Sequence, residues 1–149
     1  MNRYCVLAFT KRLLRDNHAS ALIEFAMLAP VFILLLIGML QIGLQIQNYN
    51  AVRNLASDGA RYAVVQYQKG IKNSTSSIET WIRARAISEQ YNLNTDRLGV
   101  AVSQPLTGSQ IAGTTEMDIN VTYAAPNFVP QIAASALNLS YTRPVFLMD

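Results

Sequence analysis

No charged side chain occurs between Glu24 and Arg53, and this gap constrains the fold more than any other feature of the sequence. Its first part lies within residues 20–44, which are mostly Leu, Ile, Val, Met, Phe and Ala. About 20 apolar residues, each rising about 1.5 Å along a helix, match the hydrocarbon thickness of a bilayer, about 30 Å. We therefore predict a transmembrane helix at residues 20–44.

Basic residues are concentrated ahead of this segment. Residues 1–19 carry four basic residues against one acid: Arg3, Lys11, Arg12, Arg15 and Asp16. Because basic residues beside one end of a span keep that end in the cytoplasm, residues 45–149 should form a domain on the outer side of the membrane. A cleaved secretory signal peptide is the alternative, but its apolar run is about 7–15 residues and ends in a small-residue cleavage site. Residues 41–47 offer no such site.

The helical pattern continues beyond the predicted span. Apolar residues recur every three or four positions through residues 41–68, which is the spacing of one helix face. The members of this face are Ile42, Ile46, Tyr49, Val52, Leu55, Gly59, Tyr62 and Val65. We expect one long helix that is transmembrane first and amphipathic afterwards, followed by a polar loop at residues 69–75.

A second, shorter helix is predicted after this loop. Ser76 and Glu79 have the spacing of a capping box, in which the first residue caps the helix and the fourth reaches back to it. Ile78, Trp81 and Ile82 then fall on one face, and Trp81 is expected to pack that face against the core. Further along, the hydrophobic period changes to two in residues 98–102, 117–123 and 137–142.

These patterns predict an α+β fold. Three alternating segments should form a small antiparallel sheet with one buried face, covered by the amphipathic part of the long helix and by the short helix. Pro144 suits the end or edge of a sheet. The two connections, residues 105–115 and 124–136, are longer than ordinary hairpin loops and are the expected places for partner recognition.

Several classes of function have little support in the sequence. Cys5 and His18 are the only residues of their types, so neither a catalytic set with His or Cys nor a common zinc site can be assembled in residues 45–149. No phosphate-binding glycine loop is present. The same residues are nearly balanced in charge, which argues against nucleic-acid binding. We expect no enzyme activity, no cofactor and no metal.

Two segments resemble a known family. Residues 21–31, ALIEFAMLAPV, and residues 51–63, AVRNLASDGARYA, are similar to TadE-like proteins. A basic leader, a small-residue junction, an acid five residues later and an apolar helix that runs into a small sheet also resemble the plan of type IV pilins and pseudopilins. The resemblance implies a pilin-like fold and a minor pseudopilin of the tight-adherence (Tad/Flp) pilus.

Processing by a prepilin peptidase is the first implication of this resemblance. The cut would fall between Ala19 and Ser20, which makes Glu24 the fifth and Phe25 the sixth residue of the mature chain. Family members typically have glycine before the cut, where this chain has Ala19.

The resemblance also implies partners and a location. The partners would be the prepilin peptidase, other pilins and pseudopilins of the system, the inner-membrane assembly platform and membrane lipid. The protein would cross the bacterial inner membrane once, with its N-terminus in the cytoplasm and its C-terminal domain in the periplasm. Its role would be in pilus assembly and adhesion.

Glu24 would have a specific part in such an assembly. Cleavage creates an α-amino group on Ser20 that is mostly protonated near neutral pH. In a fibre, the Glu24 carboxylate would pair with this amine, most usefully on a neighbouring subunit, which offsets the cost of burying either charge and fixes the axial register. The plainer alternative is that Glu24 is solvated at the headgroup boundary.

Two hypotheses of different classes remain. In the first, the processed helix packs laterally with other pilin-like helices, and small residues permit close approach while Pro30 is tolerated within the span. The expected packing residues are Ala26, Ala29, Pro30, Gly38 and Gly43. In the second, the chain is an unprocessed single-span anchor that presents a small periplasmic domain for binding or adhesion.

Overall fold

A computed structural model describes residues 17–105, 109–129 and 134–148 and shows an α+β arrangement, as predicted. The predicted leader, including Cys5, lies outside the described residues as far as residue 16. The chain divides into two compact units, residues 1–40 and 41–149, which are described separately below.

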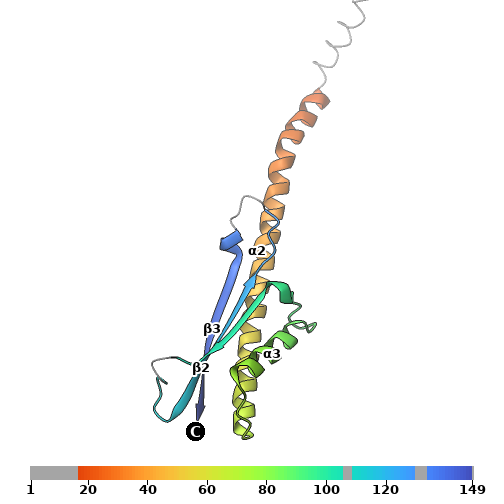
Figure 1. The fold of residues 1–149 in the computed structure, drawn as a ribbon. Helices are drawn as coiled ribbons and strands as arrows, with labels where there is room; N and C mark the ends of the chain where they lie inside the picture. The colour runs from red at the N-terminus through yellow and green to blue at the C-terminus, as the bar shows by residue number, and fades with distance from the viewer. Residues whose placement is uncertain (1–16, 106–108, 130–133, 149) are drawn as a thin grey trace, which may run out of the picture. The chain divides into compact units, whose positions relative to one another are not determined.

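The first unit contains the start of the long helix. This helix, α2, runs over Asn17–Gln68 with Pro30 inside it, so the predicted long helix and its end at Gln68 are confirmed (Figure 1). Large apolar side chains from Leu22 to Leu40 are exposed. Among the described residues, the part of α2 from Ala21 onwards is the one helix long and apolar enough to cross a membrane.

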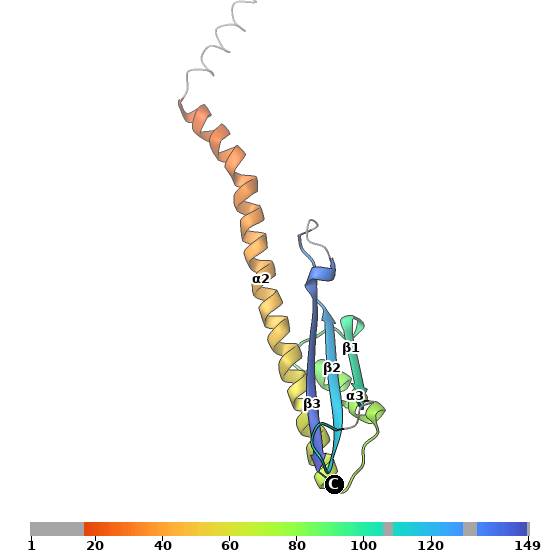
Figure 2. The same ribbon diagram turned by 90° about the vertical axis from the view of Figure 1, so that its left-hand side faces the viewer.

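The second unit combines the rest of α2 with a three-stranded sheet. Strands β1 (Leu98–Ser103), β2 (Thr114–Ala124) and β3 (Asn138–Met148) are antiparallel in the order β1-β2-β3. The short helix α3 (Thr75–Ala86) and α2 pack against the same face of this sheet (Figures 1 and 2). Two short 3₁₀ turns, Thr95–Arg97 and Ala134–Leu137, precede β1 and β3.

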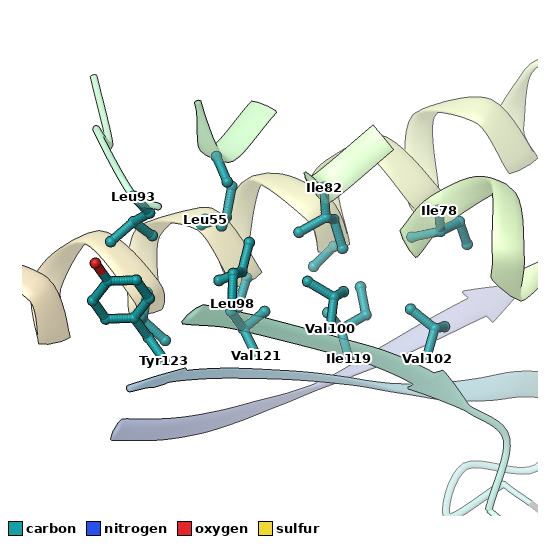
Figure 3. Packing of buried hydrophobic residues seen from close by; sticks show 14 of the residues in the cluster. Leu55, Ile78, Ile82, Leu93, Leu98, Val100, Val102, Ile119, Val121 and Tyr123 are labelled. Atoms are coloured by element: carbon teal, nitrogen blue, oxygen red, sulfur yellow. The ribbon is translucent and has the colours of Figure 1, made fainter. Parts of the chain in front are cut away.

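The core of this unit follows from the alternation of the strands. Every second residue points at the helices, and the strand register aligns them across the sheet, as with Val100 opposite Val121. Figure 3 shows these side chains meeting the apolar residues of α2 and α3. The largest fully buried side chains are Val52, Leu55, Ile78, Ile82, Ile119 and Val121.

The two helices approach closely at Gly59. A β-carbon at this position would lie 2.6 Å from Cδ1 and 2.8 Å from Cγ1 of Ile82, which is itself fully buried. Any side chain at residue 59 would therefore displace a core residue of α3.

The start of α3 differs from the prediction. The N-cap is Ser74 and not Ser76, and the Ser77 N–H donates to Ser74 Oγ at 3.3 Å. The predicted capping box is wrong because a run of serines and threonines offers several caps, and Glu79 is used elsewhere. Its Oε1 accepts from the Val102 N–H at 2.8 Å.

Side chains of α3 occupy the free edge of β1. While Glu79 accepts from Val102, the guanidinium of Arg83 donates through Nη1 to the Leu98 carbonyl at 3.0 Å. Three outward-facing backbone groups of β1 thus have partners from the helix beside it: the Leu98 and Val100 carbonyls and the Val102 N–H.

Strands β2 and β3 are longer than predicted. The third predicted segment, residues 137–142, continues to Met148, and Leu137 belongs to the 3₁₀ turn before it. Pro144 lies inside β3, opposite Asp118. A proline is tolerated there because β3 is an edge strand, where half of the donors have no partner in the sheet.

Candidate functional site

The residues expected to direct processing all lie on α2. Ala19 and Ser20 have helical backbone, and Glu24 and Phe25 are exposed. Ser20 and Glu24 are four residues apart, which corresponds to about one helical turn and about 6 Å of rise. Positions four residues apart face the same side of a helix and are one turn from each other. The α-amino group that cleavage creates on Ser20 would therefore lie about one turn from the Glu24 carboxylate.

The small residues expected to mediate helix packing do not form a single stripe. At about 100° per residue, Ala29 and Pro30 fall within about 60° of Ala26, on one side of α2. Gly38 lies about 120° away in one direction, and Gly43 lies about 100° away in the other. The helix geometry therefore brings the first three together and separates the two glycines from them and from each other.

Both glycines border open space in the described structure. A β-carbon at Gly38 or Gly43 would meet no atom within 4 Å. Neither position is needed for packing within the described residues. Two different sides of the helix therefore allow close approach by another chain.

Gln41 forms a contact that the sequence pattern did not reveal. Its side chain is 3% exposed, its Nε2 donates to the Pro126 carbonyl at 2.9 Å, and its Oε1 accepts from the Phe128 N–H at 2.9 Å. One turn later, Gln45 Nε2 donates to the Leu137 carbonyl at 3.3 Å. The amide of Gln41 thus binds the backbone of the connection after β2 as a neighbouring strand would.

The predicted apolar face is wrong in the first two turns of α2 in this unit. Ile42 and Ile46 were expected to be buried but are 62% and 59% exposed. Here the helix packs against the backbone of a loop, whose N–H and C=O groups need hydrogen-bonding side chains such as amides and not apolar ones. From Val52 to Gly59 the predicted face is correct, with Leu55 at its centre, whereas Val65 at its far end is exposed.

Asp58 and Tyr91 link α2 to the loop after α3. The Tyr91 hydroxyl donates to Asp58 Oδ2 at 2.5 Å, and the tyrosine is buried. Burial and the hydrogen bond to Asp58 together raise the pKa of Tyr91 from 10.0 to about 12.

This link predicts a loss of stability at alkaline pH. Because the pKa of Tyr91 is higher in the folded chain, its stabilising effect is complete below pH 10 and is lost as the pH rises through about 12. Tyr91→Phe should cost about 1.5–3 kcal/mol at neutral pH, the usual worth of a hydrogen bond to a carboxylate, and should flatten this alkaline decline. Unfolding of the full chain in micelles at a series of pH values measures both effects. Tyr49→Phe is the control, and parallel curves for Tyr91→Phe and the parent chain would contradict the prediction.

Two grooves flank the outward side of α2. Asp58, Arg61 and Val65 line both of them. One groove continues to Arg143 on β3, and the other continues to α3, where the Trp81 ring stacks on Tyr62 at 4.3 Å between centroids. Trp81 thus joins the two helices, as expected. The basic residues around the grooves are Arg61, Lys69, Arg85 and Arg143.

None of these arrangements has the form of a metal site. Among the residues that the structure describes, no group of three or more His, Cys, Asp or Glu side chains lies close enough to bind one ion. What the described geometry offers is a set of surfaces: an exposed apolar helix, two small-residue sides and two grooves with basic rims.

The comparisons with known proteins match one part of the chain. Residues 19–61 match the family described as TadE-like protein. Neither the curated proteins nor the solved structures contain a match to this chain. The matched part begins at the predicted cleavage junction, spans the whole apolar segment and ends on the part of α2 that packs against α3 and the sheet.

Proposed function

From the premise that residues 19–61 are a TadE-like segment, we propose that this chain is a minor pseudopilin of the tight-adherence pilus. The match itself is the observation that carries the proposal. It covers the acid-bearing start of the apolar helix and the first core residues, Val52 and Leu55, in one continuous stretch. The protein acts by assembly with other pilin-like subunits and not by catalysis.

The exposed apolar side chains of residues 22–40 support a helix that is surrounded first by lipid and later by the helices of other subunits. Phe25, Phe32 and Leu36 are 71%, 60% and 65% exposed, so this segment needs lipid or other helices around it. In the proposal, the chain first crosses the bacterial inner membrane once, with its C-terminal domain in the periplasm. After cleavage between Ala19 and Ser20, the helix packs against neighbouring subunits, and the assembly platform and other pilins are its partners.

The N-terminal residue and intact mass of the membrane-extracted protein test this proposal. We expect a chain that begins at Ser20 when the prepilin peptidase is active and a chain that begins at Met1 when it is inactivated. Ala19→Gly, which restores the residue typical of the family, should be cut at least as completely. Ala19→Leu, with a bulky side chain before the cut, should remain uncut.

The alternative function has one observation in its favour. Ala19 departs from the glycine that family members typically have before the cut. A full-length chain in the presence of active peptidase would therefore support an unprocessed single-span anchor that presents its α+β domain for adhesion. In that case Ala19→Gly would show whether residue 19 alone prevents processing.

A further inference from the structure

Two uncharged stretches of the sequence meet at Gln41. Residues 25–52 contain no charged side chain, and neither do residues 119–142. The first stretch belongs to α2, and the second runs from β2 through the connection to β3. Gln41 joins the two stretches in space, because its side chain donates to the Pro126 carbonyl and accepts from the Phe128 N–H.

The position of Gln41 along α2 indicates how deep this contact would lie in a membrane. A span of about 20 residues that begins near residue 21 ends near residue 41. Gln41 directly follows the last apolar residue of the first unit, Leu40. If α2 crosses a membrane, Gln41 therefore lies at the boundary between hydrocarbon and headgroups, and Phe128 lies at the same level because its N–H binds the Gln41 side chain.

The side chains at this level are suited to such a boundary. Phe128 is 53% exposed, and Ile42 and Ile46 on the adjoining turns of α2 are also exposed. The next charge along α2 is Arg53, 12 residues and about 18 Å beyond Gln41. Asp96 and Arg97 just precede Leu98, which pairs with Tyr123, so they lie beside the end of β2, ahead of the segment that carries Phe128.

The bonding of Gln41 also fits a layer with little water. Backbone groups of an irregular segment need internal partners at membrane depth, because no water is present to replace them. Gln41 supplies a donor to the Pro126 carbonyl and an acceptor to the Phe128 N–H with one buried side chain. At a fully solvated surface, water would satisfy both groups equally well.

We infer that the segment Pro126–Val129 is a lipid contact: Phe128 inserts into the interfacial layer of the bilayer, and Gln41 holds the segment against α2. Amphipathic or apolar aromatic rings at the hydrocarbon boundary are typical of membrane proteins. The inference rests on the proposed function only in requiring that α2 spans the membrane. It adds a second point of membrane contact, more than 80 residues along the chain from the first.

Quenching of tryptophan fluorescence by brominated lipid tests the inference. The full chain with Trp81→Phe is reconstituted into two sets of phosphatidylcholine vesicles, one brominated near the carbonyl end and one near the methyl end of the acyl chains. Single tryptophans are then introduced by Phe128→Trp, by Phe32→Trp within the span and by Ile111→Trp. Ile111 is the matched control because it is also exposed and lies on a connection, beyond the opposite end of β2.

Three outcomes are distinguishable. We expect strong quenching of F32W by bromine near the methyl end, strong quenching of F128W by bromine near the carbonyl end, and quenching of I111W that is several-fold weaker with either lipid. Quenching of F32W with F128W as weak as I111W would overturn the inference while leaving the membrane span intact. Absence of quenching in F32W would overturn the span, and the inference with it.

Removal of the Gln41 amide tests the second half of the inference. Gln41→Met keeps the length of the side chain but removes its donor and acceptor. In this background, quenching of F128W should fall several-fold toward the level of I111W, whereas Gln47→Met on an exposed position of α2 should leave it unchanged. Unchanged quenching of F128W with Gln41→Met would show that Gln41 does not position the segment.

Discussion

Glu24→Ala is expected to exclude the protein from assembled pili while leaving its α+β domain folded. In the proposed fibre, the Glu24 carboxylate pairs with the α-amino group of Ser20, and removal of one partner leaves the other charge buried. An uncompensated buried charge costs about 3–5 kcal/mol. Since about 1.4 kcal/mol changes an equilibrium tenfold, incorporation should fall by roughly two orders of magnitude or more.

The measurement is the amount of this protein in sheared pili relative to the membrane fraction. Glu24→Gln has nearly the same shape without the charge and should fail equally, whereas Glu24→Asp should retain part of the incorporation. The intact mass of each variant shows whether cleavage before Ser20 still occurs, which separates a defect in assembly from a defect in processing. Normal incorporation of Glu24→Ala would mean that Glu24 is solvated at the headgroup boundary.

Leu55→Ala should produce the largest loss of stability in the domain. Leu55 is fully buried where α2 meets α3 and the sheet (Figure 3). Truncation of a buried leucine costs about 2–5 kcal/mol, which is a large share of the 5–15 kcal/mol that stabilises a typical domain. The α+β domain of this variant should therefore unfold at a markedly lower temperature.

Near-ultraviolet circular dichroism of the full chain in micelles measures this loss. The signal of Trp81 stacked on Tyr62 reports the contact between α3 and α2, and is independent of the helical content of the span. Val65→Ala, at a site 39% exposed on the same helix, is the matched control and should change stability by no more than about 0.5 kcal/mol. Equal melting of the two variants would contradict the assignment of Leu55 to the core.

Apolar periodicity was sufficient to predict most of the fold. The period of three to four residues located α2 and α3, and the period of two located all three strands, because these elements bury one face against a shared core. The prediction failed where the buried partner is polar backbone. Gln41 binds a loop and Glu79 binds a strand edge, and neither contact leaves a periodic signal.

The candidate site was predictable only in part, for a related reason. The prediction of Ala19, Glu24 and Phe25 as processing residues rests on a local motif, which is readable in one sequence, and it stays a prediction. Whether Ala26, Gly38 and Gly43 share a face depends on helix rotation, and counting at about 100° per residue separates them. The contact of Phe128 with Gln41 joins residues 87 positions apart, and no local pattern encodes such a pairing.

The contacts of Arg83 and Glu79 with the edge of β1 have a consequence for association between copies of this chain. Exposed strand edges are templates on which identical chains add further strands and aggregate. Here α3 already binds the Leu98 carbonyl and the Val102 N–H, two of the backbone groups of β1 that a second copy would need. Pairing of two copies of this chain through the β1 edge is therefore disfavoured.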